Sequence, residues 1–181
     1  MRTSLALIIV LVGCGGGSSL TDNEGVYTLA TWTDNMESCD AEGRSILDIQ
    51  EPNLFIKNEN FLGSVFVNVN PCPDLGTCQA EASDDETIHL GNWAFESGSD
   101  SGGWTSQSAF GFSVDGECQA TRLVATLTFT GDSLRIEDRR QEGTFPADAN
   151  DECSEAEAEA ATAGQPCIAL EVVTAAFTAG F

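Results

Sequence analysis

The stretch LVATLTFTGDSLRIEDR (residues 123–139) decides the fold. Its first half alternates between leucine, alanine or phenylalanine and valine or threonine, a period of two that is typical of a half-buried β-strand. The second half alternates in the same way, with Leu134, Ile136 and Asp138 on one side and charged residues on the other. Because the glycine turn GDS separates the two halves, the stretch predicts an antiparallel β-hairpin.

The same alternation recurs along most of the chain. Valine alternates with phenylalanine or asparagine over residues 65–69, and phenylalanine or valine alternates with glycine or serine over 110–114. Together with the hairpin, these segments indicate about nine strands. The remaining predicted strands lie near residues 26–33, 45–50, 54–58, 87–96 and 168–178.

One segment departs from the strand pattern. Residues 154–162 read SEAEAEAAT, a run of good helix formers that starts with a helix-capping serine. Because the run has no large apolar residue, we expect a short helix on the surface. Many antiparallel strands with short turns and one surface helix predict an all-β fold, an antiparallel up-and-down β-barrel of about eight or nine strands. A β-sandwich is the alternative.

The N-terminus carries the features of an export signal. A short basic region at residues 1–3 is followed by an apolar run, Leu5–Val12, which is too short to cross a bilayer as a helix. Leu11-Val12-Gly13-Cys14 resembles the lipobox of bacterial lipoproteins, in which the signal peptide is removed before the cysteine. The resemblance implies a signal peptide over 1–13, a lipidated and flexible tether over 14–24, and a single β domain over 25–181.

The lipobox resemblance also implies a location. Cys14 would carry the acyl chains, such as palmitate, and about two chains suffice for stable membrane attachment. Gly15 stands where an aspartate retains some lipoproteins at the inner membrane, so the resemblance implies the outer membrane of a bacterial cell envelope. Both the periplasmic and the outer side of that membrane remain open.

Six cysteines remain after Cys14. An even number of cysteines in an exported chain indicates disulfides rather than a metal site, since the only short spacing here is C-x5-C. Local spacing favours two pairs, and the third follows from what is left. We expect Cys72–Cys78, Cys153–Cys167 and Cys39–Cys118.

The predicted β domain also resembles the lipocalins, through lipocalin-like bacterial lipoproteins. The segment Gly25–Leu29 resembles the G-x-W segment that opens the first lipocalin strand, with Tyr27 in place of tryptophan, and the hairpin Thr128–Ile136 resembles theirs. The resemblance implies a closed barrel, whose interior has room for side chains or for one small ligand. Large aromatic residues are either core or the lining of a ligand pocket. The residues we consider for such a lining are Trp93, Phe95, Phe110 and Phe112.

The charge is strongly negative, with 29 acidic against 7 basic residues and a net charge of -22. Such a surface repels nucleic acids, so they are excluded as partners, and it attracts cationic proteins. The acidic clusters at 84–86 and 148–152 lack the spacing of an EF-hand loop, so we interpret them as solvated surface.

Catalysis is not expected. Asp100-Ser101-Gly102-Gly103 resembles the tetrapeptide around the nucleophile of chymotrypsin-like proteases, but the single histidine, His89, has neither the position nor the surroundings of the catalytic base. We therefore expect a monomeric, non-enzymatic, cofactor-free binding module, anchored to the membrane by lipid. Its ligand would be a small apolar molecule. The alternatives are a protein-interaction module, for example an inhibitor of a cationic enzyme, and a structural acidic surface lipoprotein.

Overall fold

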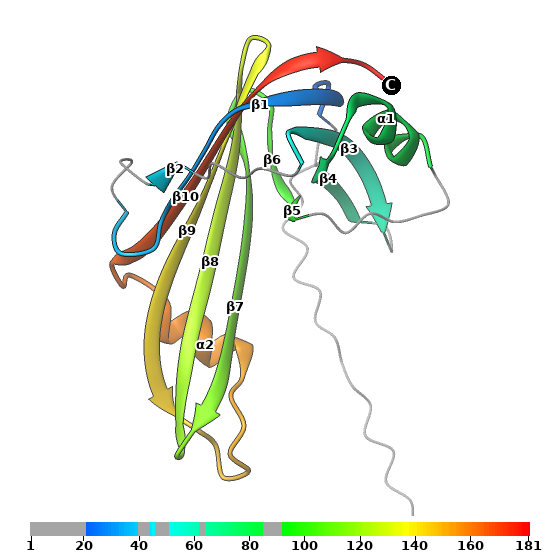
Figure 1. Ribbon diagram of the computed structural model, residues 1–181. Coiled ribbons are helices and arrows are strands. Elements are labelled where there is room, and N and C mark those ends of the chain that lie inside the picture. Colours follow the sequence, from blue (N-terminus) through cyan, green and yellow to red (C-terminus); the bar gives the residue numbers. More distant parts are fainter. Residues whose placement is uncertain (1–20, 40–43, 46–50, 62–63, 85–91) are drawn as a thin grey trace, which may run out of the picture.

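The chain folds into an antiparallel up-and-down β-barrel, seen in a computed structural model (Figure 1) that describes residues 21–39, 44–45, 51–61, 64–84 and 92–181. Within these residues nine strands follow one another in the order β5-β4-β3-β1-β10-β9-β8-β7-β6, and β2 pairs with β1. Only Glu96 separates β5 from β6, so this bridge joins the two ends of the sheet and nearly closes the barrel. The strands are β1 (Gly25–Asn35), β2 (Arg44–Ser45), β3 (Asn53–Phe61), β4 (Ser64–Cys72), β5 (Trp93–Phe95), β6 (Ser97–Ser99), β7 (Gly103–Val114), β8 (Glu117–Thr130), β9 (Ser133–Pro146) and β10 (Cys167–Ala179).

The barrel confirms the predicted fold class. The hairpin that decides it is present as β8 and β9, with Thr130 opposite Ser133 across a two-residue turn. Gly131 in this turn has φ +57°, a backbone conformation that glycine adopts without strain. The first and last of the long strands, β1 and β10, are neighbours in the middle of the sheet and pair antiparallel along most of their length.

Side chains fill one end of the barrel. Among the largest fully buried side chains are Trp104, Phe95, Leu54, Ile56 and Leu127, which belong to one continuous core cluster. Protein interiors of this kind are packed as densely as organic crystals. The described side chains at this end therefore form a packed core.

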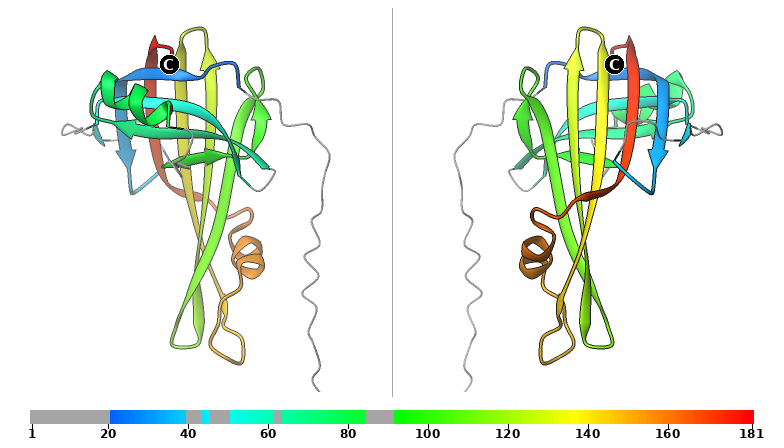
Figure 2. Two further views of the ribbon diagram at one scale, coloured as in Figure 1. Left: turned by 90° about the vertical axis from the view of Figure 1, so that its right-hand side faces the viewer. Right: turned by 90° about the vertical axis from the view of Figure 1, so that its left-hand side faces the viewer.

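The three long strands β7, β8 and β9 run on beyond the barrel as a three-stranded arm, residues 108–123 and 140–146 (Figures 1 and 2). The helix α2 (Glu155–Thr162) packs on one face of this arm. Two glycines allow the close approach, since a Cβ on Gly143 would lie 2.5 Å from the carbonyl oxygen of Ala161, and one on Gly111 would lie 3.2 Å from the Cβ of Cys153. Ser154 caps the helix by accepting a hydrogen bond from the backbone N–H of Glu157, as the sequence predicts.

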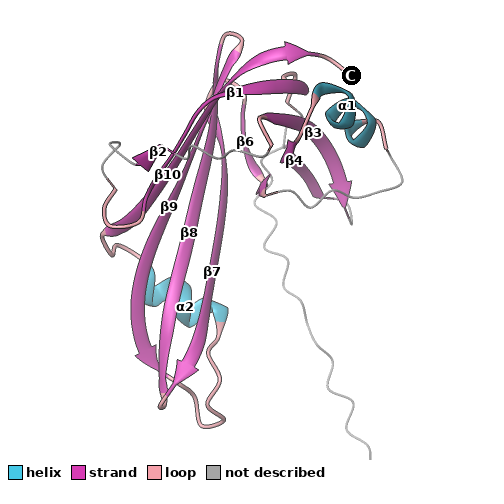
Figure 3. Cartoon of the chain, viewed as in Figure 1, coloured by secondary structure: helices cyan, strands magenta, loops and turns pink. Residues whose placement is uncertain are grey.

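A second helix, α1 (Leu75–Ala82), was not predicted (Figure 3). The expectation of one helix was therefore wrong. Asp74 caps α1 by accepting from the backbone N–H of Thr77 at 2.9 Å. The helix covers Val26 and Phe55 on the outside of the barrel, so packing stabilises a segment whose own helix propensity is weak.

Three disulfides staple the fold, and only one has the predicted pairing. Cys72–Cys78 is confirmed, whereas the other two bonds are Cys39–Cys167 and Cys118–Cys153. The predicted pair Cys153–Cys167 is wrong because α2 lies between the two residues, and eight helical residues rise about 12 Å, about twice the Cα separation of a disulfide. The predicted pair Cys39–Cys118 is wrong as a consequence.

The N-terminal residues of the described chain lie against the barrel. Thr21 is 3% exposed, and its hydroxyl donates to Asp100 at 2.6 Å. The expected tether therefore does not extend over 21–24, because hydrogen bonds to Asp100 and Asn58 hold the start of this segment. Cys14, the lipobox, His89 and the predicted strand residues 46–50 lie outside the described residues.

Candidate functional site: the mouth of the barrel

The inner face of the barrel turns acidic below the core. On three neighbouring strands, Asp34 of β1 lies directly opposite Glu171 of β10, and Glu171 lies directly opposite Asp138 of β9. Directly opposed residues in a sheet have Cβ atoms about 5 Å apart, and like charges in such pairs destabilise the sheet. Three carboxylates in one inward-facing row are therefore an unfavourable arrangement for folding alone.

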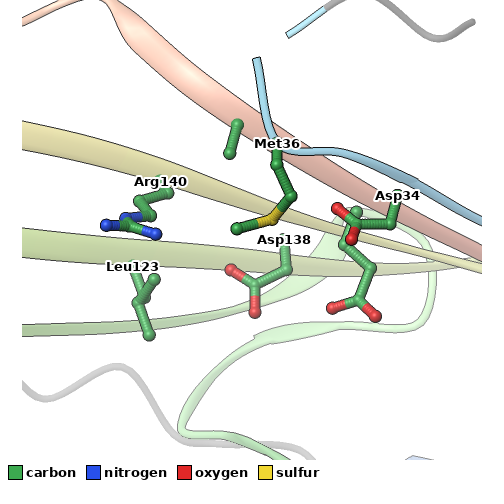
Figure 4. Close-up of a pocket in the computed structure, with 7 residues that line it drawn as sticks. Asp34, Met36, Leu123, Asp138 and Arg140 are labelled. Atoms are coloured by element: carbon green, nitrogen blue, oxygen red, sulfur yellow. The ribbon is translucent and has the colours of Figure 1, made fainter. Parts of the chain in front are cut away.

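The row of carboxylates lines a pocket, which we call the mouth (Figure 4). Its volume is about 170 Å³, and its apolar wall comes from Met36, Leu123 and Ala169, with Arg140 at one side. Figure 4 shows the Met36 side chain extending from the end of β1 toward Asp138.

A smaller lobe of about 90 Å³ shares Leu123 and Asp138 with the mouth. Trp93, Ser106 and Ser108 are among the residues that line it. Asp138 thus faces both lobes from the middle of the site.

Burial raises the pKa values of Asp138 and Glu171. Desolvation raises the pKa of Asp138, and the indole of Trp93 partly offsets this shift. Desolvation also raises the pKa of Glu171, opposed by a hydrogen bond from Trp32 and reinforced by the charges of Asp138 and Asp34. The Oδ1 atom of Asp138 is buried and has no hydrogen-bond partner among the described residues. These carboxylates lack the neutralising contacts that buried charges usually have.

Two indoles hold the carboxylates in place. The Nε1 atom of Trp32 donates to Oε1 of Glu171, and the Trp32 and Trp93 rings lie 6.0 Å apart between centroids. The indole of Trp32 thus fixes the Glu171 carboxylate, while Trp93 lines the smaller lobe beside Asp138. The three carboxylates of the row would attract a positively charged group.

The one basic residue of the mouth does not neutralise the row. Arg140 forms an ion pair with Glu142, one step further along the same face of β9. Among the described residues no group of three or more histidine, cysteine, aspartate or glutamate side chains has the geometry to hold a metal ion.

The four aromatic residues considered for a ligand lining have three different positions. Trp93 lines the smaller lobe, while Phe95 is fully buried in the core. Phe110 and Phe112 are 49% and 56% exposed on the arm, so they do not line an enclosed cavity. They share the inner face with Trp104, but they lie beyond residues 103–105, where β7 pairs with β6, and so outside the nearly closed part of the barrel.

The protease-like tetrapeptide is a turn. Asp100-Ser101-Gly102-Gly103 joins β6 to β7, and the backbone N–H of Gly102 donates to the carbonyl of Ser99. Asp100 accepts from Thr21, from the backbone N–H of Asp22 and from Nε1 of Trp104. Its role in the described structure is to fasten the N-terminal segment to the barrel.

The sequence contains a signal for the mouth that the predicted aromatic lining does not include. Asp138 shares the period-two face of Leu134 and Ile136, so it had to point into the barrel. Glu171 stands in the same relation to Val173. An acidic residue on the apolar side of a strand pattern marks a functional site more specifically than an aromatic residue does.

No protein-family model, no curated protein and no solved structure matches this chain. No helix among the described residues has the length and apolar character needed to cross a membrane. The fold thus defines a structural class, the up-and-down β-barrel, and a fold by itself does not define a function.

Proposed function

We propose that this chain is a lipid-anchored binding module of the bacterial cell envelope that captures a cationic group of its partner in the mouth of the barrel. One observation carries the proposal. Asp34, Glu171 and Asp138 form a row of directly opposed carboxylates that face inward and line a pocket.

The energetics of the mouth favour a bound cation. Each raised pKa records that the ionised carboxylate is poorly solvated in the fold. An ammonium or guanidinium group would relieve both this desolvation and the repulsion along the row. Met36, Leu123 and Ala169 would pack on the aliphatic stem that carries such a group.

The size of the mouth supports a side chain rather than a free apolar ligand. A volume of about 170 Å³ is below the range of roughly 300–1,000 Å³ that is usual for sites of drug-sized molecules. We infer that the occupant is a lysine or arginine side chain of a basic protein. The net charge of -22 would steer such a partner toward the barrel, in keeping with the interaction module foreseen as an alternative.

The first expectation, a small apolar ligand, stays a second candidate for a specific reason. Phe110, Phe112 and Val114 are large, apolar and exposed on the inner face of the arm. An apolar molecule would bind there, next to the mouth, and not within the filled end of the barrel.

A titration with small probes tests the cation site. Propylguanidinium added to the soluble domain should shift the indole NMR signals of Trp32 and Trp93, whereas propanol, which has a similar stem without charge, should not. Asp138→Asn and Glu171→Gln should weaken the effect, and Glu155→Gln, on the exposed face of α2, serves as the matched control. Equal shifts with propanol would show that the mouth does not recognise charge.

The lipid anchor needs a separate test. Cys14→Ala should release the protein from the membrane fraction or leave it unprocessed, because the acyl chains would have no attachment point. Persistent membrane attachment of a processed form of this variant, from which residues 1–13 have been removed, would contradict the anchor.

A further inference from the structure

The outer edge of β7 is free along most of its length. The bridge strand β6 covers only residues 103–105, where Ser97 lies opposite Thr105 and Ser99 opposite Gly103. From Ser106 to Val114, β7 pairs with β8 on one side, and no strand within the described residues pairs with its other side. The backbone N–H and C=O groups that point to this side are available to another strand.

This edge also lacks the usual protection against strand addition. Natural edge strands are shielded by charged residues, proline or bulges. β7 has the sequence GWTSQSAFGFSV, with no charged residue and no proline, in a chain whose net charge is -22. The exposed apolar side chains, Phe110, Phe112 and Val114, all lie on one face of the unprotected segment.

Two carboxylates, those of Glu159 and Asp151, contact the opposite face of the same segment. There, Nε2 of Gln107 donates to Oε1 of Glu159 at 2.8 Å, so this α2 carboxylate reaches β7. Further along, the hydroxyl of Ser113 donates to Oδ1 of Asp151. A strand added to this edge would therefore meet apolar rings on one face and carboxylates on the other.

We propose that the free edge of β7 binds an extended segment of a basic partner protein as an additional β-strand. Every second residue of that segment is apolar and packs beside Phe110 and Phe112. The residues between them are lysine or arginine and approach Glu159 and Asp151. Backbone hydrogen bonds supply affinity and the alternating side chains supply specificity, as in other complexes formed by strand addition.

Charge argues against a second copy of this chain as the occupant. Symmetric antiparallel pairing about Phe110 would place Gln107 of one copy opposite Ser113 of the other. The carboxylate of Glu159 would then lie beside that of Asp151 in the second copy. Like charges in this position are unfavourable, while a basic strand turns the same two groups into attractive contacts.

The edge and the mouth use different groups, although they adjoin where Ser106 and Ser108 of β7 line the smaller lobe. The mouth opens on the inner face, whereas the edge uses backbone groups along the side of β7. The proposal for the edge does not rest on the proposed cation site, and variants distinguish them. Asp138→Asn should weaken propylguanidinium binding in the mouth and leave strand addition to β7 unchanged.

The probe is an acetylated octapeptide amide of alternating valine and lysine, labelled for fluorescence anisotropy. The control peptide has the same composition with its valines grouped, so its charge is equal but its two faces are mixed. The alternating peptide should bind several-fold more tightly, and hydrogen exchange should slow at amides within residues 106–114. A version that is N-methylated along both edges should lose binding, since it cannot donate hydrogen bonds to β7.

Side-chain variants test the two faces. Phe110→Ser and Phe112→Ser should each weaken the binding of the alternating peptide about threefold, a typical loss for one cross-strand pair. Phe181→Ser removes another half-exposed phenylalanine away from the edge and should have no effect. Glu159→Gln should also weaken binding, whereas Glu51→Gln, an exposed control, should not.

Three results would overturn the proposal. Equal binding of the alternating and grouped peptides would show that only net charge is recognised. Undiminished binding of the N-methylated peptide would exclude backbone pairing. A concentration-dependent dimer in which amides 106–114 become protected without any peptide would assign the edge to a second copy.

Discussion

Asp138 is a residue whose ionisation opposes the fold. Burial raises its pKa, so between the unfolded and the folded pKa the native state binds more protons than the unfolded chain. Stability contributed by this group therefore falls as pH rises through that window and stays lower at neutral pH. Asp138→Asn should raise the free energy of unfolding at pH 7, by less than about 1 kcal/mol because solvent screens a half-buried group.

Urea unfolding at two pH values measures this effect. Below a pH of about 4, where unfolded carboxyls are protonated, Asp138→Asn and the parent should differ little. Glu155→Gln, on the exposed side of α2, controls for the loss of one negative charge. A variant that is less stable than the parent at neutral pH would show that the Asp138 carboxylate contributes to folding.

Asp100 has the opposite behaviour. Burial alone would raise its pKa, but hydrogen bonds led by those from Thr21 and Trp104 outweigh it and lower the pKa below the usual range. Its contribution to stability is therefore present above the unfolded pKa and is lost as pH falls through the folded pKa. Asp100→Asn should cost about 1–2 kcal/mol at neutral pH, somewhat less than the roughly 1.5–3 kcal/mol of a hydrogen bond to a charged group, because solvent screens this partly exposed carboxylate.

Thermal unfolding of the Asp100 variant, followed by tryptophan fluorescence, checks this value, since Trp104 donates to the same carboxylate. Hydrogen exchange at residues 21–24 should also speed up. If those amides exchange as slowly as in the parent, Asp100 does not fasten the N-terminal segment.

At the scale of elements, the packing of α2 on the arm requires a glycine at position 143. A Cβ at position 143 would approach the carbonyl oxygen of Ala161 to 2.5 Å, a distance that real Cβ atoms do not reach, so the helix or the arm must move. Gly143→Ala should destabilise the fold by about 1–3 kcal/mol, the usual cost of overpacking. Gly180→Ala is the matched control, because no atom lies within 4 Å of its added Cβ. Chemical denaturation of both variants makes the comparison, and equal midpoints would mean that α2 moves without cost.

The sequence predicted the elements with strong local signals and missed those that depend on packing. The β8–β9 hairpin has alternation and a glycine turn, and α2 has its capping serine and helix formers. By contrast, α1 contains Gly76 and Thr77 and is held by the Cys72–Cys78 bond and by contact with Val26 and Phe55. Its stability comes from partners distant in the chain, which a local pattern does not contain.

For the whole molecule, the offset between neighbouring strands decides what the pattern could not. Trp104, Phe110 and Phe112 share one face of β7, so periodicity alone assigns all three to the same interior. Because β7 extends past the end of β6 and β9 extends past the end of β10, Phe110 and Phe112 lie beyond that interior and are exposed. The disulfide pairing is likewise set by the three-dimensional arrangement. α2 separates Cys153 from Cys167, so Cys153 pairs with Cys118 on the arm and Cys167 pairs with Cys39.

The net charge of -22 should give salt opposite effects on folding and on binding. Repulsion among the carboxylates opposes the compact state, so screening it with sodium chloride should raise the melting temperature between about 0.01 and 0.2 M, where the Debye length falls from about 30 to below 10 Å. The same screening removes the attraction of a basic partner and should slow its association with the barrel. Calorimetry and stopped-flow association with the valine–lysine peptide measure the two effects on one sample.

A melting temperature that falls with salt while association also slows would mean that the three arginine–glutamate ion pairs on β9 outweigh the global repulsion. Arg139→Gln should then reverse the slope, because it removes one of those pairs and leaves the repulsion larger.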